Sequence, residues 1–196
     1  MTMTVRDHAL DPAPVPAVPM TWEQWLAFEP EDGAGRYELV EGVPVVTPPE
    51  SALNHWAVMQ LGARILAATA REFAPMANAG IRTKGEPAST GRQADLLVVS
   101  REAVRETLYF AGEEVVLAVE CVSVGSSDER DWVTKRAEYA RVGVQAYLVV
   151  DRARGQLVLF DEIVDGVYSR RQEADPQVTL RLGRHRVPVS LDQLVD

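Results

Sequence analysis

The sequence predicts a mixed α/β domain, with α+β character, in which helices flank a central sheet. Two nearly continuous apolar runs, within residues 93–99 and 115–123, are typical of strands that are covered on both faces. Between Ser51 and Phe73, apolar residues recur instead at steps of three and four, which indicates a long helix. Because strand patterns and helix patterns alternate along the chain, we expect helices to pack on the sheet.

The chain is expected to form one domain. Residues 1–19 are rich in Pro and Ala and predict a disordered lead-in, and residues 20–196 contain no linker or internal repeat. A length of 196 residues is sufficient for one full hydrophobic core. The single cysteine, Cys121, excludes an internal disulfide.

The N-terminal elements follow from capping and turn residues. Thr21 and Gln24 have the spacing of a capping box, which predicts a short helix that continues to Phe28. Residues Tyr37 to Val46 predict a hairpin, because Glu41-Gly42 lies at its centre as a turn signal.

The long helix is expected to end before Pro75, because proline interrupts a helix. Three strands should follow at 78–84, 93–99 and 115–123. The polar residues Gly125 to Asp128 predict a loop, after which a helix should extend to Val142 with Gly143 at its C-cap. A strand from Val144 to Asp151, a strand at 156–162 and two further short strands then form a C-terminal β extension.

Composition limits the classes of function. The net charge of -9 argues against long-range attraction to nucleic acid. Residues 1–50, however, hold nine acids and two bases, whereas the rest of the chain holds 20 acids and 18 bases and is nearly neutral. No apolar run is long enough to cross a membrane, and the N-terminus lacks the apolar core of a signal peptide. We therefore expect a cytoplasmic protein.

Two carboxylates lie in unusually apolar surroundings. Asp95 precedes Leu96 to Val99, and Glu120 ends the run Val115 to Val119. Carboxylates are rarely buried unless they are paired or bind a metal. If the two strands are neighbours, both acids can converge on one hard cation such as Mg²⁺ or Mn²⁺. The alternative is that each acid marks a strand end and faces solvent or an arginine.

One face of the following helix carries Asp131, Lys135 and Tyr139 at steps of four. Only Lys84 and Lys135 are lysines among the 20 basic residues, which hints at a special role for a compact ammonium group. The alternative is an ordinary solvated salt bridge between Asp131 and Lys135.

Together these residues resemble the Uma2 (DUF820) family, a branch of the PD-(D/E)XK restriction-endonuclease-like nucleases. The resemblance covers roughly residues 22–162 and depends on motifs in this order: Tyr37-Glu38-Leu39-Val40-Glu41-Gly42, Pro48-Pro49 followed by His55, Ala94-Asp95, Val119-Glu120-Cys121-Val122-Ser123, then Asp131, Lys135, Tyr139, Gly143-Val144, Tyr147 and Val150-Asp151.

The resemblance implies a restriction-endonuclease-like mixed sheet flanked by helices. It implies Asp95 and Glu120 as metal ligands, with the backbone carbonyl of Cys121 as a further ligand. The superfamily's lysine two residues after the Glu is replaced by Val122, so its role is assigned to Lys135. Ala94 stands where the family's signature has proline, a position that shapes the strand and binds nothing.

The implied activity is a Mg²⁺-dependent (or Mn²⁺-dependent) endonuclease that acts on DNA, in which Lys135 assists the attacking water. Glu38 supports the metal or is a solvent-facing hairpin acid. His55 contacts substrate or is a capping or packing histidine. Lys84 contacts substrate or is a solvated cation. The rival functions are a catalytically silent module of the same fold, used for binding or assembly, and a hydrolase of another phosphodiester. By analogy with restriction enzymes, we expect a homodimer.

Overall fold

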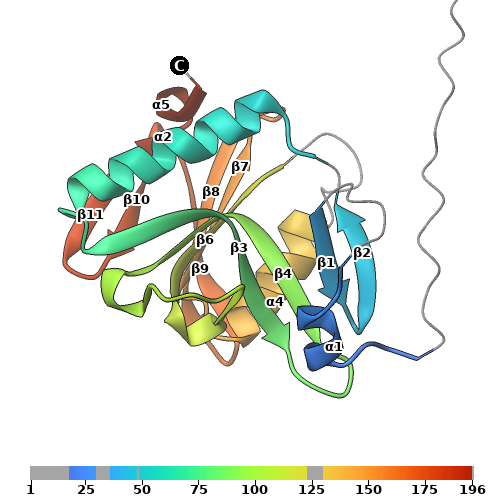
Figure 1. Cartoon of the computed structure of the whole chain (residues 1–196). Coiled ribbons are helices and arrows are strands. Elements are labelled where there is room, and N and C mark those ends of the chain that lie inside the picture. The colour runs from blue at the N-terminus through green and yellow to red at the C-terminus, as the bar shows by residue number, and fades with distance from the viewer. Residues whose placement is uncertain (1–17, 30–35, 48, 123–129, 196) are drawn as a thin grey trace, which may run out of the picture.

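The computed structural model describes residues 18–29, 36–47, 49–122 and 130–195 (Figure 1). The predicted loop Gly125–Asp128 and all but the last two residues of the predicted lead-in 1–19 lie outside these ranges. Within the described part, no helix is long and apolar enough to cross a membrane.

A large mixed sheet forms the centre of the molecule. Its described strands run in the order β2-β1-β4-β6-β7-β8-β9, and β3 pairs with both β4 and β5. The pairs β6–β7 and β3–β5 are parallel, and the other pairs are antiparallel. The strands are β1 (Arg36–Val40), β2 (Val43–Thr47), β3 (Phe73–Lys84), β4 (Thr90–Ser100), β5 (Tyr109–Ala111), β6 (Val115–Cys121), β7 (Ala146–Asp151), β8 (Gln156–Val164) and β9 (Val167–Glu173).

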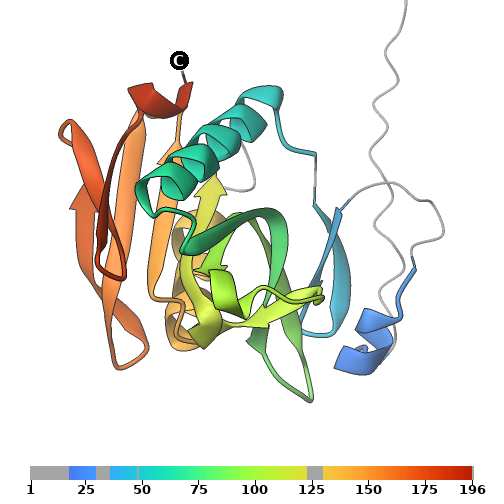
Figure 2. The ribbon, with the colours of Figure 1, turned by 60° about the vertical axis from the view of Figure 1, so that its left-hand side comes forward.

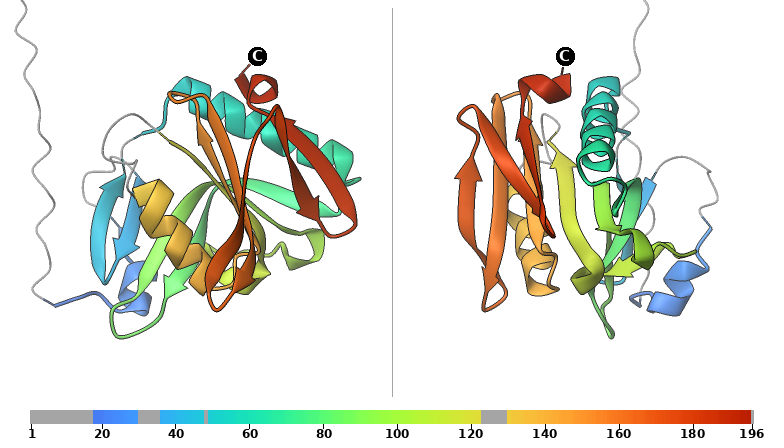
Figure 3. Two further views of the ribbon diagram at one scale, coloured as in Figure 1. Left: turned by 180° about the vertical axis from the view of Figure 1, so that it is seen from behind. Right: turned by 90° about the vertical axis from the view of Figure 1, so that its left-hand side faces the viewer.

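Helices cover both faces of this sheet, as the sequence predicts. Helix α2 crosses the front of the strands in Figure 1, and α4 lies behind them, as the view from the back confirms (Figure 3). Leu96 and Val98 of β4 pack in the cluster under α2, whereas Leu97 and Val99 pack in the cluster under α4. The helical elements are α1 (Trp22–Leu26), η1 (Arg101–Ala103), η2 (Gly112–Glu114), α2 (Ala52–Ala68), η3 (Arg130–Lys135), α4 (Arg136–Arg141) and α5 (Asp192–Val195).

The predicted capping box and hairpin are confirmed, but the first helix ends at Leu26 and not at Phe28 as predicted. Thr21 Oγ1 accepts a hydrogen bond from the Gln24 N–H at 3.2 Å, and Gln24 Oε1 accepts one from the Thr21 N–H at 2.8 Å, which completes the capping box of α1. Strands β1 and β2 form the predicted hairpin. Its turn residues Glu41 and Gly42 both have positive φ, as the tight turn requires.

The predicted end of the long helix is wrong. Helix α2 ends at Ala68. The Thr69 hydroxyl donates a hydrogen bond back to the Ile65 carbonyl at 2.7 Å. Ala70 and Arg71 then take positive φ values of 48° and 64°, which turns the chain back. Pro75 lies inside β3. At this position β3 pairs with β4 on one side, and β5 pairs with β3 only from Gly80 to Arg82. The missing N–H of proline is tolerated because β3 is an edge strand at this point.

The C-terminal β extension contains one strand more than predicted after 156–162. Strands β10 (Gln177–Leu182) and β11 (His185–Ser190) form a separate antiparallel sheet. The inward side chains of this sheet join the core under α2, and the two strands lie beside β8 and β9 in Figure 2. Alternation at Val178, Leu180 and Leu182 followed by Gly183 is the sequence signal for this second hairpin.

Two glycines allow a matched test of this packing. A Cβ at Gly112 would lie 2.3 Å from the Val142 carbonyl oxygen, whereas a Cβ at Gly62 of α2 would meet its nearest atom, in Pro75, at an ordinary 3.6 Å. We expect Gly112→Ala to lower the free energy of unfolding by about 1–3 kcal/mol. Gly62→Ala should raise it by about 0.5–1 kcal/mol, because alanine is the better helix residue. Urea denaturation of both variants checks these opposite signs; equal effects would contradict the packing around Gly112.

Candidate active site

Four carboxylates and one lysine meet inside the fold, beneath the helical segment formed by η3 and α4. Each has an exposed fraction of 5% or less. Strand β1 supplies one acid, β4 and β6 supply one each, and η3 supplies the fourth acid and the lysine. The five residues are Glu38, Asp95, Glu120, Asp131 and Lys135, and we call them the carboxylate cluster.

Lys135 lies at the centre of this cluster. Its Nζ is 3.0 Å from Glu120 Oε1, 3.2 Å from Glu38 Oε1 and 3.8 Å from Asp131 Oδ1. Burial alone would lower the pKa of Lys135, but the three carboxylates outweigh burial and raise it above its usual value. The ammonium group therefore stays charged. The predicted alternative, a solvated pair with Asp131, is wrong because both side chains are only 3% exposed.

The local conformation of η3 presents Asp131 and Lys135 to the sheet. This segment is a π-helix, an arrangement found mostly in short pieces and frequently at functional sites. The buried hydroxyl of Tyr147 in β7 donates to the Asp131 carbonyl at 2.8 Å, which ties η3 to the sheet. Lys135 additionally donates to the Gln93 carbonyl of β4 at 3.5 Å.

Glu120 is the penultimate residue of β6. Its Oε1 accepts hydrogen bonds from the ammonium of Lys135 and, at 2.9 Å, from the hydroxyl of Tyr139 in α4. Burial raises the pKa of Glu120 well above the usual range, and Asp95 adds to this effect while Lys135 opposes it. The predicted alternative of a solvent-facing strand end is therefore wrong for Glu120.

Asp95 lies within β4 and reaches across to the end of β6. Its Oδ2 accepts a hydrogen bond from the Cys121 N–H at 2.8 Å, and its Oδ1 is 3.5 Å from Arg36 Nη1. Burial raises the pKa of Asp95, although the hydrogen bond from Cys121 works in the opposite direction. Asp95 and Glu120 thus come from neighbouring strands, which is the condition that the sequence analysis set for both acids to converge on one cation.

Cys121 contributes through its backbone. Its carbonyl oxygen accepts a hydrogen bond from Asn54 Nδ2 of α2 at 3.3 Å. The thiol is buried, and burial raises its pKa well above the usual value, which makes it a poor nucleophile. Asn54 is a residue that the sequence analysis missed, because nothing in its local pattern indicates that α2 begins beside β6.

Glu38 is not the solvent-facing hairpin acid that one alternative predicts. Its carboxylate is 1% exposed, accepts a hydrogen bond from the Gln93 N–H at 3.0 Å and pairs with Arg92 Nη1 at 3.1 Å. Burial raises the pKa of Glu38, but the cations Lys135 and Arg92 together lower it below its usual value. Glu38 is therefore a charged anchor for the lysine.

Arg92 fixes this anchor to the helix. Its guanidinium contacts both carboxylate oxygens of Glu138 in α4 at 2.7 Å and is only 4% exposed. Fork-like pairing of this kind defines the orientation of both partners. The sequence analysis missed Arg92, although a cation three positions before Asp95 in the same strand was a usable signal.

The two residues proposed to contact substrate lie apart from these side chains. Lys84 Nζ pairs with Glu41 Oε1 at 2.9 Å beside the exposed hairpin turn. His55 is exposed in the first turn of α2. The structure therefore brings neither residue into the carboxylate cluster.

The donor set suits a hard divalent cation. Asp95 and Glu120 offer carboxylate oxygens and Cys121 a carbonyl oxygen, the ligand types that Mg²⁺ and Mn²⁺ take. Among the described residues, no group of three or more His, Cys, Asp or Glu side chains is arranged as a ready metal cage. Mg²⁺ commonly binds through only one or two carboxylates, water and substrate phosphate. Burial raises the pKa of both Asp95 and Glu120, and a divalent cation held between them would favour their charged forms.

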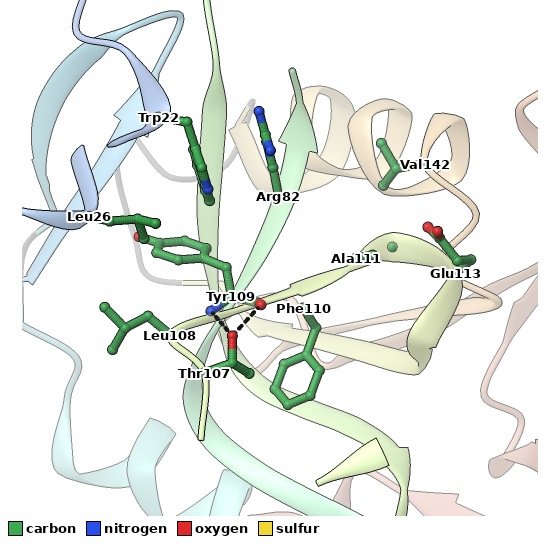
Figure 4. A pocket seen from close by; sticks show the side chains of 11 residues that line it. Trp22, Leu26, Arg82, Thr107, Leu108, Tyr109, Phe110, Ala111, Glu113 and Val142 are labelled. Carbon is green, nitrogen blue, oxygen red and sulfur yellow. Dashed lines mark hydrogen bonds between the residues drawn. The ribbon is translucent and has the colours of Figure 1, made fainter. Parts of the chain in front are cut away.

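A pocket of about 600 Å³ lies elsewhere, between α1, β3 and β5 (Figure 4). The guanidinium of Arg82 stacks 4.5 Å from the ring centre of Trp22, and Trp22 meets Tyr109 edge to face. No member of the carboxylate cluster lines this pocket. Its volume alone therefore does not make it the reactive site.

Comparisons with known proteins agree with the fold. The crystal structure of a "putative nuclease belonging to DUF820" from Anabaena variabilis ATCC 29413 superposes with a TM-score of 0.69 at 13% sequence identity, over 90% of this chain and 98% of that chain. No curated protein matches the chain. The Uma2 family, described as "Putative restriction endonuclease", matches residues 22–185. Because this match spans most of the sequence and includes every member of the carboxylate cluster, the chain belongs to the Uma2 family.

Proposed function

We propose that this protein is a metal-dependent endonuclease that hydrolyses phosphodiester bonds in DNA. The observation that supports this most directly is the burial of Lys135 against Glu120, beside Asp95 on the neighbouring strand. Enclosing an ammonium and several carboxylates costs folding free energy. Such a cost is typical of a functional site, where charged groups are held ready for chemistry.

Asp95 and Glu120 would hold Mg²⁺ or Mn²⁺, with the carbonyl of Cys121 as a further ligand. The bound ion supplies Lewis acidity and lowers the pKa of coordinated water. The resting hydrogen bonds on Asp95 and Glu120 come from an N–H group, a hydroxyl and an ammonium, all of which donate to the charged form. Both carboxylates are therefore held in fixed orientations for a cation.

Lys135 would stabilise negative charge on the phosphate during hydrolysis. Its carboxylate neighbours keep it protonated, so the ammonium acts as a hydrogen-bond donor and point charge rather than as a base. Glu38 and Asp131 orient the ammonium, and Tyr139 fixes the Glu120 carboxylate beside it. These contacts set the positions of the reacting groups before substrate binds.

The direct test is cleavage of supercoiled plasmid DNA. We expect nicked or linear product with Mg²⁺ or Mn²⁺ and none with EDTA. Cleavage of RNA but not DNA would correct the substrate. No cleavage of any nucleic acid by the wild type would overturn the proposal and favour the catalytically silent module instead.

Metal binding provides a second prediction. Calorimetry should detect binding of Mn²⁺ to the wild type, and either Asp95→Ala or Glu120→Ala should abolish it, because each removes one anionic ligand. Asp161→Asn is the control: Asp161 is also buried, at 7% exposure, but pairs with Arg170 on β9. Unchanged binding in both ligand variants would exclude this pair as the metal site.

A further inference from the structure

The pocket between α1, β3 and β5 has an aromatic wall and a charged wall (Figure 4). The rings of Trp22 and Tyr109 form the aromatic wall: their centres are 4.9 Å apart, and both side chains are half-buried. The guanidinium of Arg82 forms the charged wall beside the indole of Trp22. A volume of about 600 Å³, lined mainly by apolar and aromatic groups with a few polar ones, is typical of a small-molecule site.

The charge of Arg82 is not neutralised within the described part of the chain. No described carboxylate forms an ion pair with its guanidinium, and its Nε is buried without a hydrogen-bond partner. Glu86, in the connection from β3 to β4, instead accepts a hydrogen bond from the Trp22 N–H at 2.7 Å. Contact with an indole orients a guanidinium but supplies no anion for its N–H donors. A buried donor without an acceptor costs free energy, and a ligand in the adjoining pocket would supply the acceptor.

One end of the pocket combines aromatic surface with positive charge. Among the described residues that line the pocket, Arg82 is the only base and Glu113 the only acid. Figure 4 shows Glu113 at the opposite end from Trp22, so it does not offset the guanidinium. Aromatic rings that stack on bases, together with cations that pair with phosphates, are the means by which proteins hold a single strand of nucleic acid.

The pocket lies near the carboxylate cluster. Tyr109, Gly80 and Gln93 stand opposite one another on β5, β3 and β4. Two strand spacings of roughly 4.8 Å place the backbone of Tyr109 about 10 Å from that of Gln93. The side chains of these two residues also share a hydrogen bond. The backbone of Gln93 contacts the cluster itself, because its N–H donates to Glu38 and its carbonyl accepts a hydrogen bond from Lys135.

We propose that this pocket binds a nucleotide, whose base stacks on Trp22 and Tyr109 and whose phosphate pairs with Arg82. A nucleotide matches both walls because it joins a planar aromatic ring to an anion through one sugar. The choice of a nucleotide rests on the proposed nuclease function. At a rise of about 3.4 Å per nucleotide, about three nucleotides of a substrate strand would span the distance from the pocket to Gln93.

Fluorescence anisotropy of a fluorescein-labelled deoxyadenosine hexamer in EDTA tests the charged wall, because binding is then measured without metal and without cleavage. Arg82→Gln should raise the dissociation constant by about 10-fold, since one charge-assisted contact is lost. The slope of its logarithm against the logarithm of salt concentration should also fall by about 0.7, the value for one phosphate contact. Arg181→Gln is the matched control and should change neither quantity, because Arg181 is 53% exposed on β10, outside the pocket.

Replacing Trp22 tests the aromatic wall. Trp22→Leu retains an apolar side chain but removes the ring, and should raise the dissociation constant of the hexamer by about 5-fold or more. Trp22→Phe retains a ring and should preserve most of the affinity, with an unchanged salt dependence. Circular dichroism checks that each variant is folded. If Trp22→Leu does not fold, the salt dependence of Arg82→Gln still decides the proposal.

Competition separates the two sources of a nucleotide. If the pocket serves a substrate strand, dAMP should displace the labelled hexamer only at a higher concentration than unlabelled hexamer does; if it serves a free nucleotide, the two concentrations should be equal. Deoxyadenosine lacks the phosphate and should compete at least about 10-fold more weakly than dAMP. Equal competition by deoxyadenosine and dAMP, wild-type binding by Arg82→Gln, or no binding of the hexamer by the wild type would each overturn the proposal.

Plasmid cleavage is scored separately from this binding. Cleavage by a wild type whose hexamer binding is unaffected by the pocket substitutions would overturn the pocket and leave the nuclease function standing. Binding that depends on Arg82 and Trp22, in a wild type that cleaves no nucleic acid, would do the reverse.

Discussion

Replacing Lys135 by methionine is expected to reduce plasmid cleavage by about 100-fold or more. Methionine retains an unbranched apolar side chain but removes the ammonium that contacts Glu120, so charge that develops on the phosphate would lose this fixed donor. Lys135→Arg should also fail, because a planar guanidinium does not fit the position where Nζ lies between Glu38 and Glu120. The measurement is the initial rate of plasmid nicking at saturating Mg²⁺.

The same substitution is expected to affect stability. Loss of one partner from a buried ion cluster costs about 3–5 kcal/mol, because the remaining carboxylates are left without their cation. Rates must therefore be compared at a temperature where urea denaturation shows the variant to be folded. Lys84→Ala is the control: Lys84 is exposed and pairs only with Glu41 among the described residues, so activity should be retained. Cleavage by a folded Lys135→Met variant at the wild-type rate would remove Lys135 from the mechanism.

Glu120→Gln is expected to abolish cleavage and to stabilise the metal-free protein. The amide cannot provide an anionic metal ligand, so the rate should fall by about 100-fold or more. Stability should rise at neutral pH, because burial raises the folded-state pKa of Glu120 above its unfolded value. A carboxyl whose pKa is raised by folding stabilises the protein fully at a pH below its unfolded-state pKa. This contribution is lost as the pH rises through its folded-state pKa. We therefore expect Glu120→Gln to raise the free energy of unfolding of the metal-free protein at pH 7.

Glu38→Gln is the matched control with the opposite sign. The folded-state pKa of Glu38 is lowered, so its charged form contributes stability above its unfolded pKa and loses it as pH falls through the folded pKa. Removing this charge should destabilise the protein at neutral pH. Urea denaturation at pH 7 measures both variants, and stabilisation by Glu38→Gln together with destabilisation by Glu120→Gln would contradict the electrostatics of the cluster.

The sequence by itself determined the features that depend on near neighbours in the chain. The capping box at Thr21 and the turn at Glu41-Gly42 form as predicted, because each requires only local hydrogen bonds or backbone angles. The sheet flanked by helices follows from hydrophobic periodicity, and carboxylates inside apolar runs identified Asp95 and Glu120 as exceptional. The sequence contains this information because the burial of one face of a helix or strand produces a periodic pattern of apolar residues within that element.

Tertiary structure decided which charges are buried together. The spacing of Asp131 and Lys135 fits a surface pair equally well, and only the packing of η3 on the sheet encloses them. Arg92 and Asn54 gain their roles from contacts with elements distant in sequence, with Glu138 in α4 and Cys121 in β6.

The wrong prediction for the end of the long helix shows the limit of local patterns. Pro75 suggested a helix end, but the chain had already reversed at Ala70. The proline is accommodated because β3 pairs with β4 on one side there, and β5 pairs with β3 only from Gly80 to Arg82. Periodicity shows that a side chain is apolar or charged. The residue that each such side chain contacts is decided by packing between elements distant in sequence, and the local pattern does not contain that information.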